Sequence, residues 1–86
     1  MVNNVSTFLT PDTQLAAYLI SENFPLLEIS YEPRYNNRQR GIFVFPESPL
    51  LTEKINAFNS GKATINLALY EHAKSSLLDR VVRGLP

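Results

Sequence analysis

The chain contains no cysteine and no tryptophan, and its 86 residues include a single histidine and three glycines. Without cysteine there is no disulfide, no thiol nucleophile and no zinc site of the usual cysteine and histidine ligands. The glycines at positions 41, 61 and 84 are too widely spaced to form a phosphate-binding loop. These absences exclude several classes of enzyme, and we expect no metal and no cofactor.

Long hydrophobic segments are also missing. No apolar run approaches the roughly 20 residues that a membrane-spanning helix needs. Residues 1–7 show neither a basic region nor the apolar run of a signal peptide. We therefore expect a cytoplasmic protein with no membrane segment.

The composition is that of a folded domain: 44% of the residues are hydrophobic and 19% are charged. Disordered chains are less hydrophobic and carry more net charge, whereas here eight basic residues balance eight acidic ones. The length fits one domain over residues 1–86. A chain this short buries only about 60–65% of its unfolded surface, so its stability should be small.

The pattern of the first half predicts a strand, a helix and a β-hairpin. Residues 5–9 favour a strand, and Thr10 and Pro11 predict a helix start with Thr10 as the cap and Pro11 in the first turn. That helix should end near Asn23, because Pro25 disfavours helical geometry before it. Residues 26–32 alternate in polarity, and residues 41–45 are continuously apolar, which indicates a central strand.

The second half predicts two helices. Ser48 and Pro49 begin the first, and Gly61 is placed to end it. Residues 62–65 suggest a short extended segment, after which Asn66 caps a long helix over residues 67–83. The order β-α-β-β-α-(β)-α predicts an α+β fold in which a small antiparallel sheet has helices packed on one face.

Three short motifs resemble a family of small uncharacterised proteins from bacteria and their phages. The first is F-x-T-x-D-x-x-L-A-A-x-L, and it begins at Phe8. The others are the F-x-F strand beginning at Phe43 and the F-x-x-G-x-A-x-I stretch beginning at Phe58. This domain family has no assigned activity. The resemblance therefore implies a shared fold and a phage or mobile-element origin, and it implies nothing about chemistry.

Few residues are candidates for catalysis. The one histidine, His72, is adjacent to Glu71 in a helix, so the two do not share a face. Asp79 lies about two turns away from His72, too far for a direct bond. Nothing in the sequence supplies a nucleophile beside this histidine. We therefore expect that the protein is not an enzyme and has no small-molecule substrate.

The zero net charge hides an uneven distribution. Residues 1–33 hold four acidic side chains and no basic one, whereas residues 34–46 hold three arginines and no acid. Arginines bind phosphates and tyrosines stack on bases, so this hairpin tip is a candidate nucleic-acid contact. Its residues are Tyr31, Arg34, Tyr35, Arg38 and Arg40. The alternative is a solvated turn whose arginines offset Glu28 and Glu32.

The last helix carries more apolar side chains than one narrow buried stripe requires. The alternatives are a long helix that covers the sheet and a helix that also contacts a partner. The candidate interface residues are Tyr70, Leu77, Leu78, Val81 and Val82.

These observations favour a small non-enzymatic binding or accessory protein. It would act through contacts with a protein partner or, as a homodimer, with itself. The alternative hypothesis is a nucleic-acid-binding protein that uses the basic hairpin tip, residues 33–40.

Overall fold

The computed structural model describes residues 6–33 and 39–84, which form three strands and three helices. The elements are β1 (Thr7–Thr10), α1 (Thr13–Ser21), β2 (Glu28–Pro33), β3 (Gln39–Pro46), α2 (Pro49–Asn59) and α3 (Leu67–Gly84).

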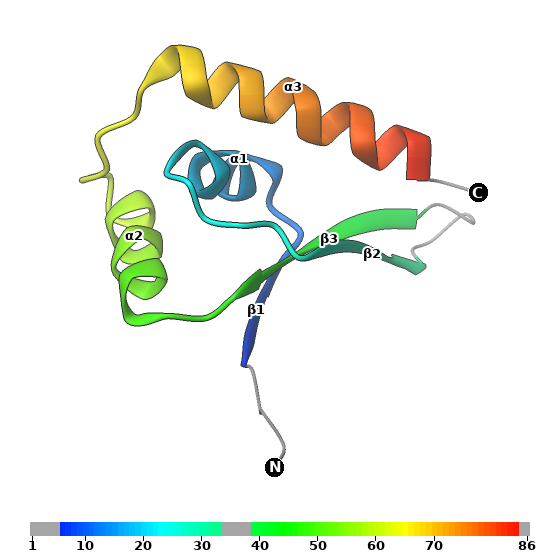
Figure 1. Ribbon diagram of the computed structural model, residues 1–86, viewed down its shortest axis with the longest axis horizontal. Coiled ribbons are helices and arrows are strands. Elements are labelled where there is room, and N and C mark those ends of the chain that lie inside the picture. Colours follow the sequence, from blue (N-terminus) through cyan, green and yellow to red (C-terminus); the bar gives the residue numbers. More distant parts are fainter. Residues whose placement is uncertain (1–5, 34–38, 85–86) are drawn as a thin grey trace.

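The strands form one antiparallel sheet in the order β1-β3-β2 (Figure 1). Strand β3 is central, as its continuous apolarity predicts, and it pairs with both neighbours. Val44 lies opposite Leu9 of β1 and opposite Glu28 of β2. The antiparallel pairing of β2 with β3 confirms the two strands of the predicted hairpin.

Helices α2 and α3 begin where their capping residues predict. The Ser48 hydroxyl accepts a hydrogen bond from the Leu51 amide at 3.1 Å, and Pro49 follows as the first helical residue. The Asn66 side chain accepts one from the Leu69 amide, also at 3.1 Å. Gly61 ends α2 with φ of +76°, a conformation that glycine adopts without a steric penalty.

The predicted cap of α1 is wrong by two residues. Asp12, and not Thr10, is the cap, and its carboxylate accepts bonds from the Gln14 and Leu15 amides. The Thr10 hydroxyl instead accepts a bond from the Asp12 amide at 3.0 Å. A carboxylate serves better than a hydroxyl at this position because it also meets the positive end of the helix dipole.

The end of α1 confirms the predicted stop near Asn23, which has φ of +70°. The Phe24 amide donates back to the Leu19 carbonyl at 3.1 Å, and the Asn23 amide donates to Ile20 at 2.9 Å. This pair of bonds closes the helix, and asparagine takes the left-handed position that glycine usually occupies. Pro25 then leads the chain into β2.

Residues 62–65 do not form the short strand that the sequence suggests. The left-handed turn at Gly61 directs this segment away from the sheet and up to the start of α3 (Figure 1). Because the segment has no strand beside it, its extended backbone has no ladder of hydrogen bonds to join.

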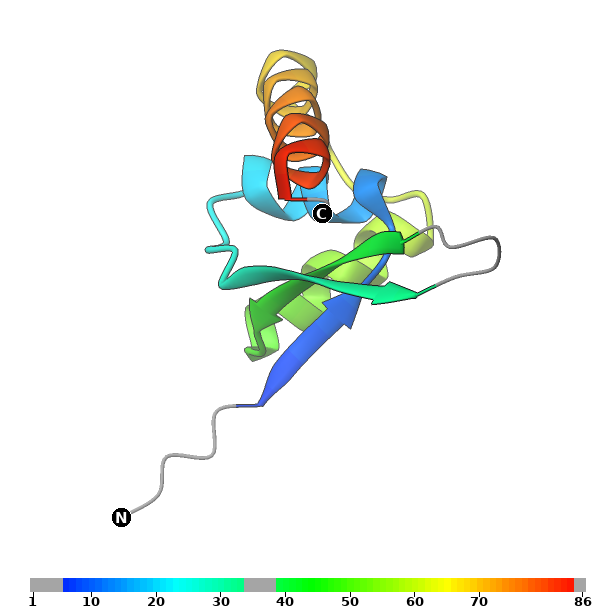
Figure 2. The same ribbon diagram turned by 90° about the vertical axis from the view of Figure 1, so that its right-hand side faces the viewer.

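Helix α1 lies between the sheet and α3, and α2 packs against its side (Figures 1 and 2). Five consecutive residues of α1, from Leu15 to Leu19, are buried. Tyr18 stacks on Phe58 of α2 with ring centroids 5.2 Å apart. Phe43 and Phe45 of β3 complete this core from below. The fold is therefore α+β, with the core between the helices and one face of the sheet.

Candidate functional site

The hairpin tip is described only in part, because Arg34, Tyr35 and Arg38 lie outside the described residues. Arg40 lies opposite Glu32 in the β-ladder and forms an ion pair with it. Its guanidinium also donates a hydrogen bond to the same carboxylate. Arg40 therefore offsets an acidic neighbour, which is the alternative to a phosphate contact that the sequence left open.

Tyr31 is not beside Arg40, although the sequence groups the two. Side chains alternate between the faces of a strand, so Tyr31 lies on the helix-covered face while Glu32 and Arg40 lie on the open one. The Tyr31 hydroxyl donates a hydrogen bond to the Val81 carbonyl of α3 at 3.1 Å. Tyr31 therefore fastens the last helix to the hairpin and does not project from its tip.

The candidate interface residues of α3 divide into buried and exposed members. Leu77 is only 1% exposed and belongs to the core, so it is removed from the candidate surface. Tyr70 and Val81 are half-buried and pack against the same core. Val81 approaches Gly41 so closely that a side chain at position 41 would meet it. Leu78 and Val82 remain exposed.

Leu67 is an exposed apolar residue of α3, like Leu78 and Val82. Leu67, Leu78 and Val82 are 69%, 47% and 68% exposed, and we call them the outer row of α3. At 3.6 residues per turn their positions fall within about 60° of one another around the helix. The candidate interface named from the sequence omits Leu67, although its helical spacing from Leu78 was a signal that could have included it.

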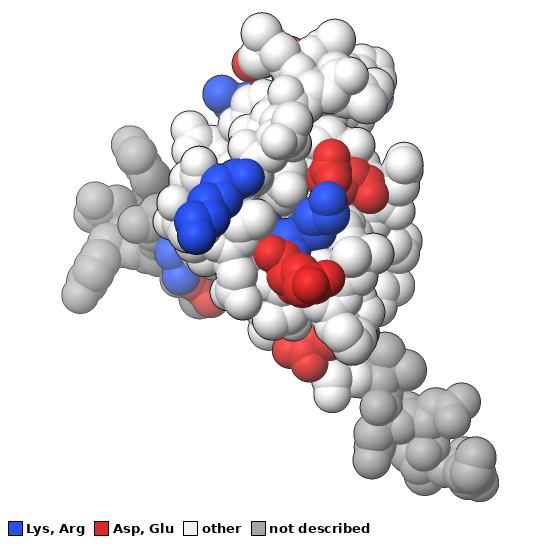
Figure 3. All heavy atoms as spheres, turned by 90° about the vertical axis from the view of Figure 1, so that its left-hand side faces the viewer, with Lys and Arg blue, Asp and Glu red and all other residues white. Residues whose placement is uncertain are grey.

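Charged side chains of both signs lie side by side on the face that includes α2 (Figure 3). One of the ion pairs is formed by Lys54 of α2 and Glu22 at the end of α1, with 2.8 Å between the ammonium and the carboxylate. The hydrogen bond and the charge of Glu22 raise the pKa of Lys54. This face therefore offers no broad patch of one sign to a charged partner.

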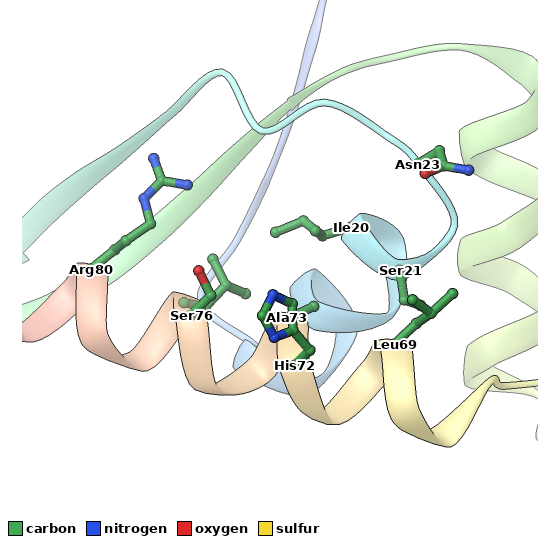
Figure 4. A pocket seen from close by; sticks show the side chains of 9 residues that line it. Ile20, Ser21, Asn23, Leu69, His72, Ala73, Ser76 and Arg80 are labelled. Carbon is green, nitrogen blue, oxygen red and sulfur yellow. The ribbon is translucent and has the colours of Figure 1, made fainter.

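A groove of about 280 Å³ lies between the end of α1 and the middle of α3 (Figure 4). Its lining combines apolar and polar side chains from the two helices and the turn after α1: Ile20, Ser21, Asn23, Leu69, His72, Ala73, Ser76, Leu77 and Arg80. His72 is thus part of a cavity, which the sequence did not indicate. Among the residues that the structure describes, no Asp or Glu belongs to the lining.

No family model, curated protein or solved structure matches the chain. The resemblance to the bacterial and phage family therefore stays a prediction. Within residues 6–33 and 39–84, no group of three or more His, Cys, Asp or Glu could hold a metal ion. In the same ranges, no helix has both the length and the apolar character required to cross a membrane.

Proposed function

We propose that this chain is a small non-enzymatic binding protein that acts through protein–protein contacts and associates with a second copy of itself. The observation that carries the proposal is the outer row of α3, Leu67, Leu78 and Val82. Single exposed apolar side chains are ordinary, but Leu78 and Val82 are one turn apart and Leu67 lies on the same side of the helix, about three turns nearer its start. The described residues that line the groove beside His72 include no carboxylate that could orient a catalytic base.

The outer row suits pairing of two α3 helices in antiparallel directions. Helix α3 has 18 residues and is therefore about 27 Å long. A two-fold axis near its middle would place Leu67 of one protomer beside Val82 of its partner, and the same contact would recur at the other end. In this register Glu71 lies beside Leu78 of the partner and one turn away from the partner's Lys74, with which it can pair.

Sedimentation equilibrium over a range of micromolar concentrations tests this arrangement. We expect a reversible dimer for the natural chain and a monomer for the double variant Leu78→Glu, Val82→Glu, because four carboxylates would meet in the apolar contact. The matched control is Leu50→Glu. Leu50 is 54% exposed on α2, away from the outer row, and its replacement should leave the dimer intact.

Thermal unfolding of each variant shows whether the fold is kept, since all three substituted residues are exposed in the protomer. A natural chain that stays monomeric at every concentration would contradict the proposal. Equal loss of the dimer in the Leu50→Glu variant would place the contact elsewhere.

The nucleic-acid hypothesis stays a prediction about the hairpin tip. A salt-sensitive mobility shift with DNA or RNA that is lost on replacing Arg34, Arg38 and Arg40 would support it. No shift at low salt would count against it.

A further inference from the structure

The groove between α1 and α3 has the features of a small ligand site. Ile20, Ala73 and Leu77 give it an apolar floor, and Leu77 is fully enclosed by the core. His72, Ser76 and Arg80 follow one another at intervals of four residues, so they lie on one side of α3. Figure 4 shows them in this order along the helix, with His72 and Ser76 nearer than Arg80 to the end of α1.

The polar side chains of the groove can all donate hydrogen bonds, and one of them, Arg80, carries a full positive charge. Arg80 offers a guanidinium, and it has no ion-pair partner among the described residues. His72 and Ser76 add a ring N–H and a hydroxyl. The Ser21 hydroxyl is already used, since it donates to the Tyr18 carbonyl at 2.6 Å.

Three carboxylates are sequence neighbours of groove residues, and none of them belongs to the lining that the described residues form. Glu22 is paired with Lys54 at 2.8 Å and Asp79 with Arg83 at 2.9 Å, and the third is Glu71. The carbonyls of Leu19 and Ile20 at the end of α1 accept bonds from the Phe24 and Asn23 amides. The groove is thus electrostatically complementary to an anion, and its floor is complementary to a short hydrocarbon.

From this arrangement we propose that the groove binds a small aliphatic carboxylate. The carboxylate meets Arg80, with Ser76 as an additional donor one turn away, and the hydrocarbon rests on Ile20, Ala73 and Leu77. At about 280 Å³ the groove is just below the usual range for sites that hold drug-sized molecules. His72 and Arg80 are about 12 Å apart along the helix, a span of only about three extended residues.

This site goes beyond the proposed self-association and does not depend on it. The groove residues and the outer row lie on opposite sides of α3, because His72, Ser76 and Arg80 are about half a turn away from Leu78. Dimer and ligand can therefore be present together, and either can be absent without the other.

The test is an amide NMR titration with three probes that share one hydrocarbon: isovalerate, isovaleramide and isopentylamine. Isovalerate should shift the amides of residues 20–23 and 69–80, whereas isovaleramide should bind at least about 5-fold more weakly and the amine should not bind. Equal binding of all three would overturn the proposal, since it would show adsorption to apolar surface only. Inorganic phosphate or a blocked Glu-Leu dipeptide binding more tightly than isovalerate would also overturn it.

Two variants of α3 provide a matched comparison. Arg80→Gln should weaken isovalerate binding by about 5- to 10-fold, because a charge-assisted hydrogen bond is lost. Arg83→Gln removes the same charge one turn away, where the arginine pairs with Asp79 at 2.9 Å outside the groove, and should change binding less than about 2-fold. Equal effects of the two would contradict the assignment.

A third variant tests the groove itself. Ser76→Leu should fill it and abolish binding, and because Ser76 is exposed the fold should be kept. Undiminished binding in a folded Ser76→Leu variant would place the ligand elsewhere.

Discussion

Helix α3 is twice as long as helix α1, yet α1 is the more buried of the two. Helix α1 has nine residues, of which five in a row are buried, whereas α3 has eighteen residues and only Ala73 and Leu77 are buried. The short helix is enclosed because elements cover it on several sides. The long helix packs against the rest of the protein on one side, and the remainder of its surface is exposed. Stability is thus concentrated in the short helix, and surface for binding is concentrated in the long one.

The most direct test of this difference replaces one leucine by alanine in each helix. Leu19→Ala in α1 should lower the free energy of unfolding by about 2–5 kcal/mol, because Leu19 is fully buried and leaves a cavity. Leu67→Ala in α3 should lower it by less than about 0.5 kcal/mol. Urea unfolding followed by circular dichroism measures both. Similar losses would mean that α3 contributes more to the core than its exposure indicates.

Two neighbouring leucines sharpen the comparison within α3. Leu77→Ala should lower the free energy of unfolding by about 2–5 kcal/mol, because Leu77 is buried in the core. Leu78→Ala should lower the free energy of unfolding of the monomer by less than about 0.5 kcal/mol. It should weaken the dimer instead. Urea unfolding measures the stability of the two variants, and sedimentation measures their association. A reversed order would mean that the helix is rotated by one position about its axis.

The hydrogen bond from Tyr31 to the Val81 carbonyl is expected to hold the end of α3 to the sheet. Tyr31→Phe should lower the free energy of unfolding by about 0.5–1.5 kcal/mol and leave the carbonyl without this donor. Amide exchange in the last turn of α3 should accelerate. Tyr70→Phe is the control, because no hydrogen bond of the Tyr70 hydroxyl with another described residue is found. Unchanged exchange in Tyr31→Phe would show that packing of Val81 alone fixes the helix.

The smallest expected effect is the pH dependence of the pair between Lys54 and Glu22. Glu22 raises the pKa of Lys54 in the folded chain, so the folded state holds that proton more firmly than the unfolded state. The stabilisation is complete below the usual lysine pKa and is lost as pH rises through the raised value. The melting temperatures of the natural chain and a Lys54→Gln variant should therefore differ near neutral pH and converge as the pH rises above the raised pKa of Lys54.

Lys62→Gln, an exposed lysine on the turn after α2, serves as the control for this experiment. A gap between the natural chain and Lys54→Gln that grows with pH would contradict the assignment of the shift to Glu22.

Much of the fold could be predicted because its signals are local. Ser48 with Pro49, Gly61 and Asn66 mark helix ends through bonds to their own backbone neighbourhood, and each is found in its expected place. The cap of α1 was misassigned because Thr10 and Asp12 both flank Pro11 and both are good capping residues. Burial of Tyr18 was missed, since periodicity reveals one apolar face and not enclosure from several sides.

The candidate sites depend on contacts between distant segments, and for that reason the sequence could not place them. Tyr31 and Arg40 are grouped by composition but are separated by the alternation of the strands. Leu77 and Leu78 are equivalent in composition, and only the packing of α3 on α1 distinguishes them. The groove exists because His72 and Arg80 meet Ile20 and Asn23, which are some fifty positions earlier in the chain.

The enclosure of α1 also determines the order in which the chain can fold. Its apolar residues are covered on one side by β3 and on the other by Ala73 and Leu77, all of which follow it in the sequence. Among the described residues that precede this helix, the core includes only Phe8, so the helix gains most of its contacts after the last helix has been synthesised. Folding should accordingly be a late, concerted event in which the first helix and the last become protected from solvent together.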